Sequence, residues 1–293
     1  MNTVGYLHIE NLYRPAAQTI LLFRECYALE KVHGTSTHVA WRDGKLHFFS
    51  GGESYDRFLA LFDQEKLSEC FTSLGHPEVT VYGEAYGGKQ QGMRSTYGDK
   101  LRFIAFDAKV GDTWLNVPSM NDVATKLGLE VVPWRKVSTD LSVLDAERDR
   151  PSEVAVRRGI VEPREREGVV LRPLVEMTTS NGSRVIVKHK GDKFSERATP
   201  QKVVDPDKLV VLTAAQAIAD EWVTPMRLDH VLQALQANGS DVSDMATTPK
   251  VIAAMLADVE REASGEIVMS RDAKAAIGRK TAELFKSKLK GMS

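Results

Sequence analysis

The segment EGVVLRPLVEMTTSNGSRVIVKHK (167–190) decides the fold class that the sequence indicates. Both ends of this segment are short apolar or alternating runs, which are typical of β-strands. The letters SNGS at 180–183 lie between these runs and are a strong hairpin-turn signal. Lys188 and Lys190 are two residues apart, so their side chains are expected on one face of a strand. The segment therefore predicts a β-hairpin that carries two neighbouring cations.

Toward the N-terminus, the strand pattern recurs in VTVYGEAY (79–86) and in LRFIAFDAKV (101–110). Two stretches have helical spacing instead, namely 53–62 and 121–129, and Ser119 is a candidate cap of the second. This part of the chain is therefore expected to be mixed and rich in strands.

The pattern changes after Pro200, where strand signals stop and helical spacing dominates. The helices expected there span 213–223, 226–237, 248–263 and 271–289. The whole chain is thus expected to be α+β, with a strand-rich domain over 1–204 and a small all-α domain over 205–293.

The composition is that of a globular protein without overall basicity. Of its 293 residues, 42% are hydrophobic and the net charge is −1, so any nucleic-acid partner must be bound by a local basic surface. Cys26 and Cys70 are too few for a disulfide framework and fit a reducing compartment. No signal-peptide pattern and no membrane-length apolar run is present in the sequence, so we expect a cytoplasmic protein.

The string EKVHGT at 30–35 contains the strongest candidate nucleophile, Lys31. A lysine amine becomes nucleophilic when neighbouring cations or burial favour its neutral form. Lys188 and Lys190 would supply such cations if the fold brings them close. Gly34 would let the backbone approach a ligand closely. Because K-x-H-G is a short string that occurs often by chance, its meaning depends on the rest of the chain.

Five strings follow one another in an order that resembles the nucleotidyltransferase superfamily of polynucleotide ligases and mRNA capping enzymes. They are KVHGT (31–35), VYGE (81–84), FIAFD (103–107), EGVVLR (167–172) and KHK (188–190), the last extended by KFSE (193–196). The resemblance covers about residues 28–197. His33, in the third place of the first string, resembles the RNA ligase 2 type, the double-strand RNA ligases. DNA ligases and capping enzymes usually have Asp there.

The resemblance implies a nucleotidyltransferase domain of ATP-grasp-like antiparallel sheets, in which Lys31 attacks the α-phosphate of ATP and keeps AMP. The implied cofactors are ATP and Mg²⁺, with Mn²⁺ able to substitute. The residues that it marks as catalytic are Lys31, His33, Glu84, Glu167, Lys188 and Lys190. Those that it marks as ATP-binding are Glu30, Lys31, Thr35, Glu84, Phe106, Glu167, Lys188 and Lys190. Glu84 and Glu167 are the expected metal ligands, since Mg²⁺ prefers carboxylate oxygens.

Several of these side chains have a plainer alternative. Phe106 alternates with Ile104 and Ala108 and could be ordinary core, whereas the resemblance makes it the platform that stacks on adenine. Asp107 is expected on the opposite face of that strand, as a polar partner in the site. His33 could hydrogen-bond a phosphate or an acidic side chain, or it could be a packed loop histidine.

The candidates for contacts with phosphate or RNA are Asp107, Arg172, Lys193, Arg279 and Lys280. The last two belong to the segment 271–290, which has seven basic and two acidic residues, a net of +5 (7 − 2). Such a helix could bind a phosphate backbone, or it could present an ordinary solvated face. On the first interpretation, the 205–293 domain binds RNA.

Two positions depart from the family pattern. Ser36 stands where the family often has Asn, and serine can still donate one hydrogen bond. The family also places an essential arginine shortly after the nucleophile, paired with the counterpart of Asp107. This chain has FFSGG at 48–52 instead, and the nearest replacements are Arg42 and Arg57, between which the sequence does not choose.

The predicted function is an ATP-dependent RNA ligase that seals 3′-OH and 5′-phosphate RNA ends through lysyl-AMP and an adenylylated RNA 5′ end. Each step is an in-line displacement at phosphorus, so one set of cations serves all three. The partners would be ATP and RNA ends, in a nicked duplex or a broken structured RNA, and the protein would be a monomer without a membrane contact. The alternatives are a DNA ligase or capping-type nucleotidyltransferase, and a non-catalytic RNA-binding module.

Overall fold

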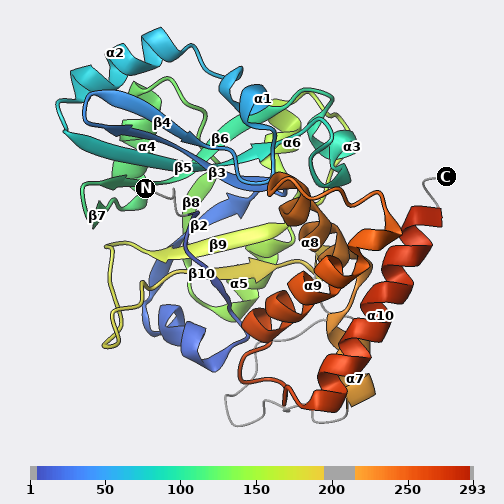
Figure 1. Ribbon diagram of the computed structural model, residues 1–293. Coiled ribbons are helices and arrows are strands. Elements are labelled where there is room, and N and C mark those ends of the chain that lie inside the picture. The colour runs from blue at the N-terminus through green and yellow to red at the C-terminus, as the bar shows by residue number, and fades with distance from the viewer. Residues whose placement is uncertain (1–4, 195–214, 291–293) are drawn as a thin grey trace. The chain divides into compact units, whose positions relative to one another are not determined.

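The computed structural model describes residues 5–194 and 215–290 (Figure 1). The chain divides into two compact units, 1–191 and 192–293. The domain boundary predicted between residues 204 and 205 lies outside the described residues, as do the last two letters of the KFSE string.

The first unit contains two five-stranded sheets. In one sheet the strand order is β1, β10, β9, β2 and β8, with bounds Glu10–Asn11, Val187–Lys190, Gly168–Pro173, Glu25–Lys31 and Trp134–Ser138. Its strand pairs are antiparallel except for β1 with β10. Because β2 and β9 are neighbours, the end of β2 at Lys31 lies beside the start of β9 at Gly168 (Figure 1).

The other sheet is antiparallel throughout. Its strand order is β4, β3, β5, β6 and β7, with bounds Lys45–Phe49, Thr35–Arg42, Glu78–Tyr86, Arg102–Val110 and Thr113–Trp114. The register between β5 and β6 shifts after Tyr82, which marks a β-bulge. Strands β5 and β6 correspond to the two strands predicted over 79–86 and 101–110.

Helices complete the first unit. They are η1 (Pro15–Leu22), α1 (Tyr55–Leu59), α2 (Gln64–Leu74), η2 (Gln90–Gly92), α3 (Arg94–Tyr97), α4 (Val117–Lys126), α5 (Leu141–Arg148) and α6 (Glu153–Arg157). α2 and α4 cover one face of the second sheet (Figure 1). Phe71 of α2 and Met120 of α4 are fully buried in the same apolar core as Val81 of that sheet. This burial explains why both helices are amphipathic.

The two helices predicted in this unit have different bounds in the structure. The stretch predicted over 53–62 forms a helix only at α1. α4 begins before 121–129, because Asn116 is its cap and accepts a hydrogen bond from the amide of Ser119 at 2.9 Å. Ser119 is therefore inside the helix and not its cap, and a proline in the first turn favours the earlier start.

The hairpin predicted over 167–190 is present, with short strands and a long arm between them. β9 and β10 pair antiparallel. Their ladder ends at the pair Leu171 and Val187, whereas β9 continues to Pro173 along β2. At the tip of the arm Gly182 has a φ of +82°, a conformation that glycine adopts without strain. The returning chain brings Arg184 against Glu176.

The second unit is helical in the part that the structure describes. Its elements are η3 (Asp192–Phe194), α7 (Ala215–Trp222), α8 (Pro225–Ala237), η5 (Met245–Thr247), α9 (Thr248–Glu262) and α10 (Arg271–Lys290). Trp222, Met255 and Phe285, from α7, α9 and α10, are buried in a core of its own. The four predicted helices agree with α7 to α10 within one residue at every described end. The predicted α+β class is confirmed, and no described helix is long and apolar enough to cross a membrane.

Candidate active site

Lys31, the last residue of β2, contacts a carboxylate at the start of the neighbouring strand. It pairs in register with Gly168, so Glu167 lies one residue before that pair. Lys31 Nζ donates a hydrogen bond to Glu167 Oε2 at 2.9 Å. The Lys31 side chain is 23% exposed and that of Glu167 only 2%. Gly168 is required here, because a Cβ would lie 2.1 Å from the backbone oxygen of His189.

Two further nitrogen-bearing side chains contact Glu167. Lys190 Nζ lies 3.1 Å from Oε1, and His33 Nδ1 lies 3.1 Å from Oε2. Burial would raise the pKa of Glu167, but the charges of Lys31, Lys190 and His33 hold that pKa well below its usual range. Glu167 is therefore an ionised carboxylate. His33 was predicted to contact a phosphate or an acidic side chain, or to be a packed loop histidine. The structure shows its contact with the acidic side chain of Glu167.

Glu84, on β5, is a second carboxylate close to Lys31. Burial raises the pKa of Glu84 to about 8, while the charge of Lys31 opposes the shift and that of Glu167 adds to it. Near neutral pH, Glu84 therefore keeps its proton. Gly34 packs against the same strand, since a Cβ there would lie 2.2 Å from the backbone oxygen of Ala85. The glycine of the nucleophile string thus serves a contact between chain segments, and its predicted approach to a ligand stays a prediction. We refer to Lys31, His33, Glu84, Glu167 and Lys190 as the Glu167 cluster.

A cavity of about 130 Å³ lies beside Lys31 and is lined by strands of both sheets. Lys31, Glu84 and Arg172 contribute charged groups to its lining, and Phe106 and Val170 contribute apolar groups. All of its lining residues belong to the first unit. An ammonium group and an aromatic ring on one small cavity can bind the phosphate and the base of a nucleotide, respectively.

Phe106 and Asp107 both face Tyr6. The register with β5 slips by one residue at this point, and Phe106 is the extra residue of the β-bulge. The rings of Tyr6 and Phe106 have centroids 5.0 Å apart, and Tyr6 Oη lies 2.6 Å from Asp107 Oδ2. The prediction that Asp107 points away from Phe106 is therefore wrong, because side chains alternate only along an unbroken strand.

The arginine partners of Asp107 come from the hairpin. Arg172 Nη1 donates to Asp107 Oδ1 at 2.9 Å, and Arg184 forms an ion pair with Oδ2. Arg42 and Arg57, the nearest replacements in sequence for the missing family arginine, form ion pairs with other carboxylates. The structure therefore assigns this pairing to neither of them.

Three other residues predicted to bind ATP are engaged with the protein. Thr35 Oγ1 accepts a hydrogen bond from the amide of Gly52 at 2.8 Å. Lys188 lies on β10 in register with Asn11 of β1. Glu30 borders the cavity, but its carboxylate is turned to a separate network.

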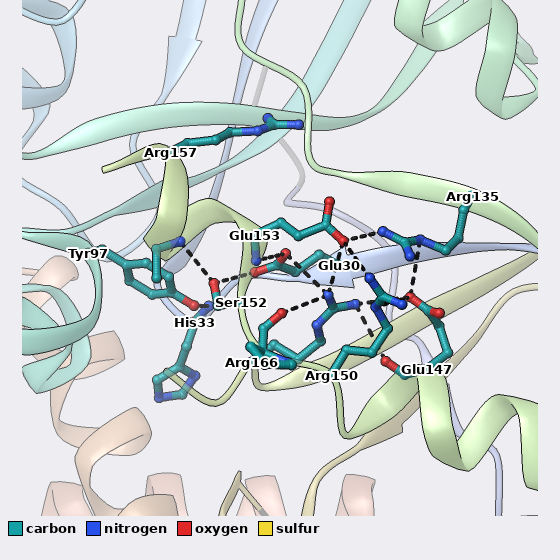
Figure 2. A network of polar contacts seen from close by, with 12 residues as sticks. Glu30, His33, Tyr97, Arg135, Glu147, Arg150, Ser152, Glu153, Arg157 and Arg166 are labelled. Carbon is teal, nitrogen blue, oxygen red and sulfur yellow. Dashed lines mark hydrogen bonds and ion pairs between the residues drawn. The ribbon is translucent and has the colours of Figure 1, made fainter. Parts of the chain in front are cut away.

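That network surrounds the residue just before Glu167, as Figure 2 shows. The carboxylate of Glu30 accepts hydrogen bonds from the hydroxyl of Ser152 and the amide of Glu153. Arg166, with a side chain 2% exposed, donates to a backbone oxygen at 2.9 Å and contacts Glu147 at 3.3 Å. We refer to Glu30, Arg135, Glu147, Arg150, Ser152, Glu153 and Arg166 as the Arg166 network (Figure 2).

The two predicted metal ligands differ in their fit to a divalent cation. Glu84 is a half-buried carboxylate with a raised pKa, and a cation would offset the cost of ionising it. Both oxygens of Glu167 already contact nitrogen donors, so a cation would have to displace one of them. The described residues contain no group of three or more acidic, His or Cys side chains arranged for a metal.

The remaining phosphate or RNA candidates lie in different surroundings. Arg172 is buried and ion-paired with Asp107. Lys193 and Arg279 are exposed in the second unit. Lys280, in the same unit, forms an ion pair with Asp220 at 2.8 Å.

Sequence reasoning missed three residues that surround the site. Arg166 directly precedes the EGVVLR string and Arg184 lies four residues before KHK, and these positions were their only signal. Tyr6 lines the cavity although it lies far before the first string and matches no motif. Its aromatic type alone does not indicate a site residue, because most aromatic side chains belong to cores.

Solved structures of Naegleria gruberi RNA ligase have a similar fold. A variant with ATP and Mn matches with a TM-score of 0.52 at 16% identity, and a variant with AMP and Mn with 0.51 at 15%. The ligase with PPi matches with 0.51 at 16%. Each match covers 66% of this chain and 58% of the solved chain, so the protein spans less than two thirds of that relative's length.

The RNA ligase family matches residues 24–190, which is more than half of the chain. The search of curated proteins found no match to this chain. The matched range begins at the start of β2 and ends at Lys190, and it therefore includes the whole Glu167 cluster. This chain belongs to the RNA ligase family.

Proposed function

We propose that the protein is an ATP-dependent RNA ligase that seals 3′-OH and 5′-phosphate RNA ends through a lysyl-AMP intermediate on Lys31. One observation carries the proposal: Lys31 lies on a cavity that Glu84 and Phe106 also line, and its amine shares Glu167 with Lys190. Membership of the RNA ligase family favours RNA ends over the substrates of DNA ligases and capping enzymes. The presence of every group that the chemistry needs weighs against a non-catalytic RNA-binding module.

In the first step, Lys31 Nζ attacks the α-phosphorus of ATP. A nitrogen–phosphorus bond forms, the bond to the bridging oxygen breaks, and pyrophosphate leaves. The amine must release its protons, and Glu167 Oε2 at 2.9 Å is an oxygen that Nζ already contacts. Lys190 adds positive charge that neutralises the phosphate oxygens as the bond breaks.

The nucleotide is held by groups of different chemistry. The ring of Phe106 offers a face for adenine, and Glu84 offers a carboxyl for the ribose or for a divalent cation. Bound Mg²⁺ or Mn²⁺ neutralises charge on the phosphate oxygens. The solved Naegleria ligase structures with ATP or AMP and Mn support this pair of cofactors. We propose Glu84 as the first metal ligand and Glu167 as the second.

AMP then moves from Lys31 to a 5′-phosphate, and a 3′-OH attacks the activated end and releases AMP. The substrate is proposed to be a nicked duplex or a broken structured RNA. Exposed Arg279 of α10 supports a contact between the second unit and a phosphate backbone. The free thiols of Cys26 and Cys70 support action in the cytoplasm, and the monomeric state stays a prediction.

The test is transfer of label from ATP labelled at the α-phosphate to the denatured chain in the presence of Mg²⁺. Label on the wild type and on Lys45→Ala, but not on Lys31→Ala, is the expected result. Lys45 is a matched control, since it is an exposed lysine at the start of β4. Label that survives in Lys31→Ala would exclude Lys31 as the acceptor, and a folded wild type without label would exclude the ATP-dependent reaction.

The polynucleotide is tested separately, with nicked duplexes that already carry AMP on the 5′-phosphate. These substrates bypass Lys31, so they report only the last step. Faster sealing of an RNA nick than of a DNA nick supports the proposal. Equal rates, or faster sealing of DNA, would contradict the RNA assignment.

A further inference from the structure

The carboxylate of Asp107 is fully buried and connects side chains from three parts of the chain. Tyr6 Oη donates to Oδ2 at 2.6 Å, Arg172 Nη1 donates to Oδ1 at 2.9 Å, and Arg184 forms an ion pair with Oδ2. Glu176 pairs with both arginines, so two positive charges face two negative ones. We call Tyr6, Asp107, Arg172, Glu176 and Arg184 the Asp107 clasp.

Arg184 supplies a charge that the sequence lacks at its expected place. The segment at 48–52 contains no arginine. Arg184 reaches Asp107 from the arm between β9 and β10, and its guanidinium carbon lies 4.2 Å from the centre of the Trp114 ring. This cation–π contact orients the guanidinium from a second side. Together with Arg172, Arg184 balances a carboxylate that would otherwise be a costly buried charge.

Tyr6 forms part of the cavity lining next to Phe106. Its ring is surrounded by Tyr82, Phe106 and Trp114, with centroid distances of 5.0, 5.0 and 5.7 Å. It meets Phe106 edge-on, with an interplanar angle of 77°. Burial raises the pKa of Tyr6, so its hydroxyl keeps the proton that it donates to Asp107. The ring therefore cannot turn away without breaking this part-buried hydrogen bond.

A second anchor holds the same segment a few residues later. β1 pairs in parallel with β10, and the amide of Leu12 donates to the backbone oxygen of Lys188 at 2.9 Å. Ile9, between the two anchors, also lines the cavity. The segment from Tyr6 to Leu12 is thus a fixed wall of the cavity, although it precedes the range that the RNA ligase family matches.

We propose that Tyr6 is a positioning residue for the base of the bound nucleotide, and that Arg184 holds it there through Asp107 in place of the arginine absent from 48–52. A purine base on Phe106 would meet the Tyr6 ring as the neighbouring wall, where apolar contact is favourable. The inference rests on the proposed function for the nucleotide, ATP, and for the place of its base on Phe106.

Binding and chemistry can be measured apart. In chains that carry Lys31→Ala, equilibrium binding of ATP reports the cavity without any covalent step. Tyr6→Ala is expected to weaken ATP binding about 10–100-fold, because it removes a half-buried ring from the wall. Tyr6→Phe keeps the ring and loses one hydrogen bond, so about a 3–10-fold loss is expected. Tyr82→Phe is the matched control, expected to stay within about twofold because no described hydrogen bond uses its hydroxyl.

In chains that keep Lys31, the same variants are followed by the rate of AMP uptake. Tyr6→Ala should raise KM for ATP by the factor found in binding and leave kcat within about threefold, as expected when ground-state binding alone is lost. Arg184→Lys, which keeps the charge but not the fork of donors, should raise KM in the same way. Arg42→Lys and Arg57→Lys should leave KM unchanged.

Each opposite result overturns part of the inference. Unchanged ATP affinity in Tyr6→Ala, with a lowered Tm, would mean that the ring only supports the fold. A raised KM in Arg42→Lys or Arg57→Lys, but not in Arg184→Lys, would overturn the assignment of Arg184. The wild-type chain could also fail to take up AMP while its Tyr6 variants bind ATP more weakly. That pair of results would uphold this inference and exclude the proposed function.

Discussion

The Arg166 network and the Glu167 cluster are made from neighbouring residues but differ in charge balance. Glu30 and Arg166 belong to the network, and the very next residues, Lys31 and Glu167, belong to the cluster. The network sets three arginines against three glutamates. In the cluster near neutral pH, two ammonium groups face the single charge of Glu167, because Glu84 keeps its proton.

On the proposed function, the difference in charge balance separates a structural group from a reactive one. The Arg166 network is balanced without a ligand, so its members fix the ends of β2 and β9 (Figure 2). The Glu167 cluster has surplus positive charge on a cavity, which an anion such as a triphosphate can neutralise. We therefore expect changes in the network to alter mainly the stability of the fold, and changes in the cluster to alter mainly the chemistry.

Arg166→Met should give the largest change in stability. Removing this buried charge leaves Glu30 and Glu147 without their shared partner, and the free energy of unfolding should fall by about 3–5 kcal/mol. Urea unfolding measures this loss. Arg150→Met is the control, because its side chain is 46% exposed and a loss of about 0–1 kcal/mol is expected. Equal losses in the two variants would refute the division into buried network and exposed rim.

Lys190→Met should show the opposite behaviour. The rate of AMP uptake from ATP should fall about 10²–10³-fold, as for the loss of one charge-stabilising donor. The free energy of unfolding should change by less than about 1 kcal/mol, since Glu167 keeps Lys31 and His33 as partners. Single-turnover labelling and urea unfolding of the same preparation check both statements. Lys45→Met is the control for labelling, and a stability loss as large as that of Arg166→Met would erase the contrast.

Glu84 makes the stability of the unliganded protein depend on pH. Its folded pKa of about 8 is above the ordinary value of 4.5, so unfolding releases a proton between these two values. The contribution of protonated Glu84 to the free energy of unfolding is fully present below pH 4.5. It is lost as the pH rises through 8, at up to about 1.4 kcal/mol per pH unit. Urea unfolding at several pH values, without divalent cations, should show a flatter curve for Glu84→Gln. Parallel curves for the two proteins would contradict the shift.

Ser152→Ala should have the smallest effect. The hydroxyl of Ser152 donates to Glu30 and accepts a hydrogen bond from the amide of Ala155 at 3.0 Å, which caps α6. Its loss should cost about 1–2 kcal/mol of unfolding free energy. Ser54→Ala is the matched control, because Ser54 precedes α1 without a side-chain capping bond and should cost under about 0.5 kcal/mol. AMP uptake by Ser152→Ala should stay close to wild type.

The helices and the strands of the hairpin were predictable because their signals are local. Apolar spacing and glycine or proline at the breaks define α8, α9 and α10 almost to the residue. β2, by contrast, reads ECYALEK, and buried residues lie on both of its faces, so it shows no alternation. A strand of this kind is determined by its neighbours and not by its own pattern.

The site divides in the same way. The order of strings predicted Lys31, Glu167 and Lys190, and the register of β2, β9 and β10 brings these three side chains together. The bulge at Phe106 and the contact of Arg184 with Asp107 were not predictable. The bulge breaks the alternation of side chains on which the prediction for Asp107 rested. The Arg184–Asp107 contact joins residues 77 positions apart through tertiary structure alone.

The separation of Lys31 from Lys190 has a consequence for the synthesis of the protein. About 160 residues lie between the nucleophile and the last strand of its site. At roughly 5–20 residues per second, a ribosome needs about 8–30 s to add them. During that interval the growing chain contains Lys31 but lacks Lys190, and for most of it the chain also lacks Glu167. If the proposed function holds, a nascent or truncated chain that lacks β10 cannot take up AMP from ATP, because its Glu167 cluster is incomplete.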